Sequence, residues 1–145
     1  MIYDKIDWHS SGDGFPKELS KEQGGTHIGM FLCWIIQNDL ISSLHLEESK
    51  ESLEKVKKQM MTGRDFLVKE CDSKFLEEDM NDVGNKFSKY YYADQDYKKY
   101  IHDYEKTFNE YSNLYEVRDT WENYNKIKPI IDKAYQEWKK SNKID

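Results

Sequence analysis

The stretch that decides the fold is Thr26-His27-Ile28-Gly29-Met30-Phe31-Leu32-Cys33-Trp34-Ile35-Ile36. Its last nine residues carry no charge, and their side chains make a helix apolar on almost every side. Because a helix that is apolar all round is buried, this run predicts the central element of the fold. Thr26 has the side chain of an N-cap, and we expect the helix to span residues 26–44. Nine apolar residues fall well short of the ~20 needed to cross a bilayer.

Residues 1–25, which precede this helix, have the composition of a looped arm. Five residues that favour turns punctuate it: Gly12, Gly14, Pro16, Gly24 and Gly25. We expect the arm to pack on the helix at 26–44, with Trp8 and Phe15 as its anchors. A loop of this length in a compact domain is more often functional than idle.

The rest of the chain shows the three- and four-residue spacing of apolar side chains that predicts amphipathic helices. The clearest stripes lie in residues 76–91, 97–115 and 121–138, and no useful strand-like alternation occurs. Pro129 lies inside the last stripe and predicts a kink or a restart of that helix. The prediction is an all-α fold, a compact bundle of about five or six helices that forms one domain over residues 1–145.

The composition is acidic: 28 Asp and Glu against 22 Lys and Arg give a formal net charge of −6. An acidic surface repels phosphate backbones and suits basic protein partners. Cys33 and Cys71 lack the spacing of a paired framework, which predicts reduced thiols in a cytoplasmic protein. The charged N-terminus shows no signal-peptide pattern. We therefore expect no nucleic-acid partner, no membrane partner and no cofactor, and favour a monomer.

A candidate partner-binding surface combines acidic residues with tyrosines. No basic residue occurs between Phe75 and Asn85, so a cationic partner would complement the acids there, and tyrosines are enriched at interfaces. On the predicted helix, Glu78 and Asp82 share one outward face. The alternative is a solvated helix N-terminus, where acids complement the dipole, together with tyrosines that fill the core. The residues assigned to this surface are Glu77, Glu78, Asp79, Asp82, Tyr91 and Tyr92.

His9, Asp13 and His27 are the residues that could form a metal or acid–base site. Two imidazoles and a carboxylate suit a divalent metal, but their spacing matches no established ligand motif. The alternative is that His9 and His27 hydrogen-bond the backbone and tie the arm to the central helix. We therefore assign no catalytic residue and no metal ligand.

The N-terminal residues also resemble a family. Members of a family of small uncharacterised bacterial proteins open with an acidic Tyr-Asp lead, then Trp-His, Phe-Pro and a Thr-His-Ile-Gly-Met-Phe-x-x-Trp block. The chain is similar to them over about its first 45 residues, through the signature Trp8, His9, Phe15, Pro16, Thr26, His27 and Trp34. The family resembles a domain of unknown function, so the resemblance implies no catalytic residues. Proteins of this kind look like immunity partners found beside polymorphic and contact-dependent toxins.

Three functions follow as hypotheses. The leading one is an immunity protein that binds the C-terminal domain of a cognate toxin, a basic domain such as a nuclease. The second is a helical adaptor or scaffold that uses exposed tyrosines. The third is a small metal-dependent enzyme that uses His9, Asp13 and His27.

Overall fold

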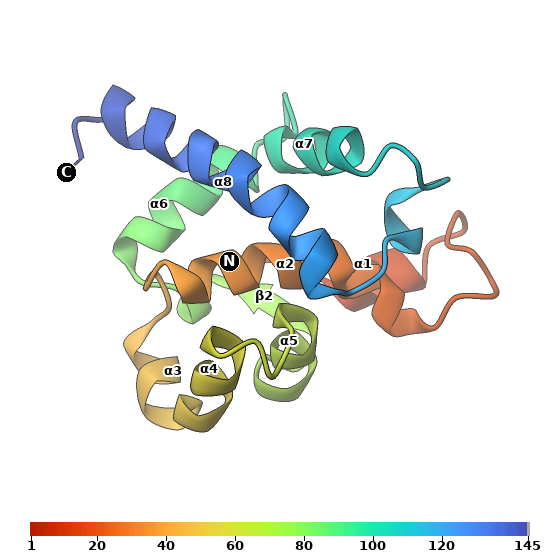
Figure 1. The fold of residues 1–145 in the computed structure, drawn as a ribbon, viewed down its shortest axis with the longest axis horizontal. Helices are drawn as coiled ribbons and strands as arrows, with labels where there is room; N and C mark the ends of the chain where they lie inside the picture. Colours follow the sequence, from red (N-terminus) through yellow and green to blue (C-terminus); the bar gives the residue numbers. More distant parts are fainter. Residues whose placement is uncertain (145) are drawn as a thin grey trace.

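The apolar run becomes α2 (Thr26–Gln37), and the other elements pack around it (Figure 1). The computed structural model describes residues 1–144. The other α-helices are α1 (Ile6–Ser10), α3 (Ser43–Glu48), α4 (Lys50–Lys57), α5 (Gly63–Glu70), α6 (Asp82–Tyr91), α7 (Lys99–Thr107) and α8 (Trp121–Ser141). Short strands β1 (Ile2–Lys5) and β2 (Lys74–Leu76) and the 3₁₀ helices η1 (Lys21–Gly25), η2 (Glu77–Asp79) and η3 (Leu114–Glu116) complete the described chain.

The helical fold class is confirmed. Figure 1 shows α2 across the middle, with α3, α4 and α5 on one side and α6, α7 and α8 on the other. Thr26 to Ile36 are all buried, as expected of a helix that is apolar all round. The helices are shorter and more numerous than the five or six predicted.

The helix expected at 26–44 ends at Gln37, so that prediction is wrong at its C-terminal end. Asp39 adopts the left-handed conformation, with φ of 58°, which a continuing right-handed helix does not accommodate. Ile41 then forms a β-bridge with Met80. Gln59 and Asp72 adopt the same conformation just beyond α4 and α5. None of the three is glycine, the residue that most often indicates such a break in a sequence.

The N-terminal arm contains regular structure where a loop was predicted. β1 pairs antiparallel with β2, α1 follows at once, and η1 leads into α2. Strands of four and three residues are too short for alternation to reveal them. Trp8 is 52% exposed and does not anchor the arm. Phe15 does, because its ring packs on Tyr115 with the ring centroids 5.0 Å apart.

The helices α2 and α5 approach one another to backbone contact. A Cβ atom at Gly63 would collide with the carbonyl oxygen of Gly29 and lie 2.8 Å from Cβ of Cys33. A Cβ at Gly29 would in turn collide with the backbone of Arg64. Only glycine permits this approach, which sets how α5 and the segment after it lie against α2.

The opposite side of α2 packs against aromatic side chains of α6, α7 and α8. Phe31 contacts Phe87 and Tyr100, and the Trp34 ring packs on Tyr135. The last helix runs without interruption through Pro129, so the predicted restart does not occur. No helix among residues 1–144 has both the length and the apolar character that a membrane crossing requires.

Candidate functional site

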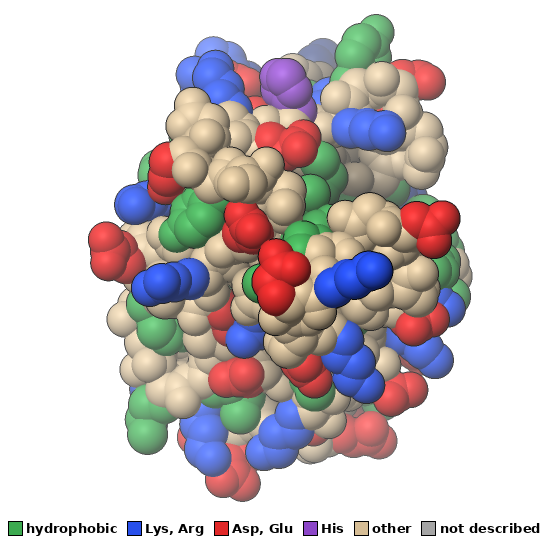
Figure 2. Space-filling view, turned by 90° about the vertical axis from the view of Figure 1, so that its right-hand side faces the viewer, with side chains coloured by type: hydrophobic (Ala, Val, Ile, Leu, Met, Phe, Trp, Pro, Cys, Tyr) green, Lys and Arg blue, Asp and Glu red, His purple; other side chains and the backbone are tan. Residues whose placement is uncertain are grey.

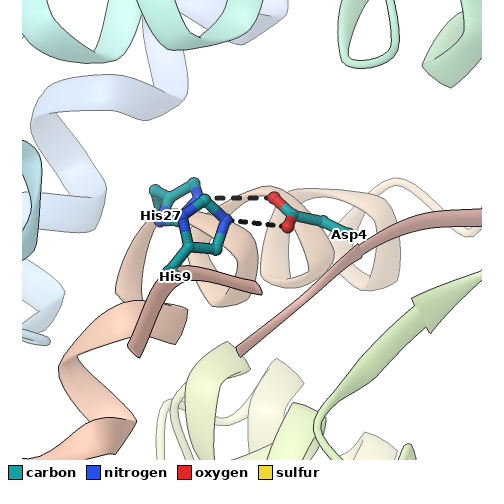
Figure 3. Close-up of side chains that lie close together, drawn as sticks. All are labelled: Asp4, His9 and His27. Atoms are coloured by element: carbon teal, nitrogen blue, oxygen red, sulfur yellow. Dashed lines mark hydrogen bonds and ion pairs between the residues drawn. The ribbon is translucent and has the colours of Figure 1, made fainter. Parts of the chain in front are cut away.

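The structure brings His9 and His27 together, but their carboxylate partner is Asp4 and not Asp13 (Figure 3). Nε2 of His9 lies 2.7 Å from Oδ1 of Asp4, and Nε2 of His27 lies 3.4 Å from Oδ2. Asp4 belongs to β1, His9 to α1 and His27 to α2. Asp13 lies exposed in the segment between α1 and η1, so the prediction that it belongs to the site with His9 and His27 is wrong.

Asp4 accepts hydrogen bonds from further groups. The hydroxyl of Tyr92 donates to Oδ2 at 2.6 Å, and the backbone N–H of Lys5 donates to Oδ1 at 2.8 Å. Nδ1 of His9 lies 2.7 Å from the hydroxyl of Tyr115. The cluster thereby joins β1 and α1 to α2, to the residue that follows α6 and to η3, which are distant in sequence.

Burial and charge set the ionisation of this cluster. Burial by itself raises the pKa of Asp4, but the imidazoles of His27 and His9 lower it by more, so its pKa lies below the usual range. Burial lowers the pKa of His27, with Asp4 opposing. Asp4 is therefore ionised and His27 neutral at neutral pH. Neither ring nitrogen of His27 forms a hydrogen bond within the described residues.

Two histidines and one carboxylate are also a set that holds divalent metals. Both oxygens of Asp4 already accept hydrogen bonds from the chain, however, and His27 is fully buried. The arrangement favours the alternative interpretation, in which His9 and His27 tie the arm to α2. One detail of that interpretation was wrong, because they contact a carboxylate and not the backbone.

Other signature residues also connect elements. Thr26 does not cap α2; Gly25 occupies the cap position, and the Thr26 hydroxyl accepts a hydrogen bond from Arg64 of α5 at 3.1 Å. The indole N–H of Trp34 donates to Asp132 of α8 at 2.8 Å. Pro16 is half-buried.

The predicted acid–tyrosine surface is not one surface. Tyr91 and Tyr92 are buried, with their hydroxyls donating to Asp103 and Asp4. The exposed tyrosine of the triplet is Tyr90, at 41%. The assignment of Tyr91 and Tyr92 to a partner-binding surface is therefore wrong, because both rings pack against Phe31 in the aromatic core.

The acidic residues assigned to the acid–tyrosine surface also lie in different environments from one another. Asp79 is buried and bonded to His45 and to the N–H of Leu76. Glu78 lies in η2, whereas Asp82 begins α6, so they do not share a helix face. Leu76 ends a strand and Glu77 to Asp79 form a 3₁₀ helix, where the apolar spacing from Leu76 onward had predicted a helix. Glu78 and Asp82 are exposed and Glu77 is half-buried.

An acidic groove lies where these elements meet; the sequence analysis assigned Glu77 and Glu78 to a partner-binding surface but did not predict the groove itself. It consists of two adjoining hollows, of about 680 Å³ and about 420 Å³, that share Lys74, Leu76 and Glu78. Five carboxylates line it at its surface: Glu48, Glu70, Asp72, Glu77 and Glu78. They come from α3, the end of α5 and η2, so no local pattern could have revealed it.

The groove differs from other parts of the surface. Lys74 is the one basic side chain among its lining residues within the described chain, apart from His45 on the floor. The face drawn in Figure 2 instead carries acidic and basic side chains interspersed, with no patch of one charge. The groove therefore offers a cationic partner a more complementary lining than the face drawn in Figure 2 does.

The family comparison matches residues 2–117 with the domain of unknown function DUF7832. The chain belongs to this family. The expected membership of an uncharacterised family is thus confirmed. In this DUF7832 protein the matched span includes the Asp4 cluster and every carboxylate of the acidic groove, whereas α8 lies outside it. Comparisons with curated proteins and with solved structures gave no match.

Proposed function

We propose that this DUF7832 protein is an immunity protein, which neutralises a cognate toxin domain by stoichiometric contact in the cytoplasm. The acidic groove is the surface that receives a basic segment of the toxin. One observation carries this proposal: five carboxylates from separate elements converge on one groove whose lining includes a single lysine, Lys74.

The ion pairs of the groove leave much of its charge uncompensated. Lys74 lies 3.6 Å from Asp72, and Lys89 lies 3.5 Å from Glu77. Glu48, Glu70 and Glu78 form no ion pair with any residue from 1 to 144. Neighbouring like charges disfavour the free protein and attract a cationic partner, and they also speed its approach.

The groove also has apolar walls. Leu76 lies between the two hollows, and the exposed side chains of Met1, Ile2 and Leu44 line its ends. Apolar contacts inside a charged rim are the usual composition of a protein interface. A typical partner covers about 800 Å². Nuclease toxins suit this surface because the lysines and arginines that grip phosphates would pair with its carboxylates.

The test is co-expression with the C-terminal domain of the toxin encoded beside this protein. We expect wild type to restore growth and to co-purify one-to-one with the toxin domain. The triple variant Glu48→Lys/Glu70→Lys/Glu78→Lys should weaken the complex about 100-fold or more at low salt, since close interfacial charges contribute several kcal/mol. Absence of both rescue and complex with wild type would rule out the immunity function.

A matched control changes the net charge equally at a distance. Glu105, Glu110 and Glu137 are exposed residues of the α7–α8 side, and their triple Lys variant should stay within about 5-fold of wild type. If this control fails equally, net charge and not the groove governs binding. The adaptor hypothesis relied on exposed tyrosines; Tyr90 and Tyr97 are exposed, whereas Tyr91 and Tyr92 are buried.

A further inference from the structure

The floor of the acidic groove holds a second cluster, formed by His45, Cys71 and Asp79. His45 belongs to α3, Cys71 directly follows α5 and Asp79 ends η2. All three side chains are buried, yet all three line the 420 Å³ hollow. One donor atom from each lies within 4.8 Å of the other two.

The three donors converge on one point. Nε2 of His45 lies 2.7 Å from Oδ1 of Asp79 and 3.7 Å from Sγ of Cys71. A catalytic Cys–His–Asp arrangement would use both ring nitrogens, one facing the thiol and one facing the carboxylate. Here a single nitrogen faces both, which is the geometry of ligands around a shared ion.

Hydrogen bonds from neighbouring groups orient His45 and Asp79 as metal ligands. Nδ1 of His45 lies 2.9 Å from the Ser49 hydroxyl, and a metal-binding histidine characteristically donates its other N–H to such a group. Oδ2 of Asp79 accepts the N–H of Leu76 at 2.7 Å, which orients the carboxylate, while Oδ1 faces Nε2 of His45 and would turn from that contact to the ion. In the Asp4 cluster, by contrast, each carboxylate oxygen that faces a histidine also accepts a hydrogen bond from another group of the chain.

The distances suit zinc. Tetrahedral zinc with its usual bonds to sulfur, nitrogen and oxygen separates sulfur from nitrogen by about 3.6 Å and nitrogen from oxygen by about 3.3 Å. The first separation is 3.7 Å in the structure, and the second, 2.7 Å, requires an opening of about half an ångström. A rotation of the Asp79 side chain that breaks its hydrogen bond with His45 would supply such an opening.

We propose that His45, Cys71 and Asp79 bind a zinc ion, whose fourth position faces the acidic groove. On binding, the Cys71 thiol loses its proton to solvent and coordinates as thiolate. The proton that Nε2 of His45 shares with Asp79 in the metal-free protein is released to solvent, and Nδ1 takes one up in exchange, so that the neutral ring binds the ion through Nε2. Glu48, Glu70 and Glu78 around the hollow draw the cation in. Water, or a side chain from a docked partner, completes the coordination.

The experiment is a titration of the purified, metal-free protein with Co²⁺, followed by displacement with Zn²⁺. We expect one equivalent of cobalt, the near-ultraviolet band of a thiolate–cobalt bond and the visible bands of tetrahedral cobalt. Cys71→Ser should abolish the thiolate band, and Asp79→Asn should weaken binding about 100-fold. The controls Cys33→Ser, which changes the other cysteine, and His9→Gln, which changes the Asp4 cluster, should bind as wild type does.

Ser49→Ala keeps all three ligands and tests the site if the ligand variants fold poorly by circular dichroism. We expect it to weaken cobalt binding about 10-fold or more. The absence of a thiolate–cobalt band in wild type, its persistence in folded Cys71→Ser or its loss in Cys33→Ser would overturn the assignment. Because no partner is present, this result is independent of whether the protein neutralises a toxin.

Discussion

Two tyrosines allow the Asp4 cluster to be tested with the same chemical change at two buried positions. The hydroxyl of Tyr92 donates to Oδ2 of Asp4 at 2.6 Å. The hydroxyl of Tyr104 is buried without a hydrogen-bond partner in the described chain. Replacing each with phenylalanine removes one oxygen atom and leaves the ring packing in place.

The two substitutions should act in opposite directions. Tyr92→Phe removes a hydrogen bond to a charged group, which contributes about 1.5–3 kcal/mol. For a chain of this length each kcal/mol shifts the melting temperature by about 3 °C, so we expect a loss of about 5–9 °C. Tyr104→Phe removes a hydroxyl that was buried without compensation and should stabilise the protein by up to about 1 kcal/mol.

Urea unfolding followed by tryptophan fluorescence measures both changes, provided that the slope of the transition stays constant. Tyr92→Phe should also shift the acid limb of unfolding to higher pH, because Asp4 loses a donor that favours its charged form. Equal destabilisation by both variants would refute the reasoning, since it would assign the effect to the rings and not to the contact with Asp4.

Two further predictions concern helix packing and pH. Gly63→Ala should destabilise the protein by about 3 kcal/mol, because the added Cβ meets the backbone of Gly29. Gly14→Ala is the control: a Cβ there would have no atom within 4 Å, so the change should be neutral or slightly stabilising. A similar loss of stability in both variants, measured by urea unfolding, would contradict the close approach of α2 and α5. Stability should fall as the pH drops below about 6.5, because the lowered folded-state pKa of His27 makes the unfolded chain bind the proton more readily. Stability should fall further below about pH 4, because the folded-state pKa of Asp4 is depressed and protonation then removes the stability that its charged form contributes. Urea midpoints that stay constant or rise as the pH is lowered from about 7 to about 4 would contradict the expectation for His27.

The position of the central helix was predictable because its pattern needs no partner. A run that is apolar on every side must be buried wherever the rest of the chain lies, and Thr26 to Ile36 are buried. The end of that helix was not predictable, because Asp39 takes a left-handed conformation that sequence favours only weakly outside glycine.

In the candidate sites, too, some residues were predictable from the sequence and others were not. Sequence alone grouped His9 and His27, together with Asp13, and offered the interpretation that the two histidines tie the arm to the central helix. It could not supply Asp4, because that carboxylate reaches them only when β1 pairs with β2, a strand about 70 residues away. It also could not show which of the three consecutive tyrosines faces the core, because that depends on the rotation of α6 against α2.

What the sequence by itself determined is therefore the helical class, the buried helix and the acidic character of the surface, all of which follow from local composition and periodicity. The tertiary structure alone decided which side chains meet. The contact between Gly29 and Gly63 sets α5 against α2 and so fixes where the chain leaves α5. Cys71 follows at that point, beside His45 and Asp79, 26 and 8 positions away in the chain. Such convergence depends on how the elements pack, because side chains that are far apart in sequence leave no local pattern to read.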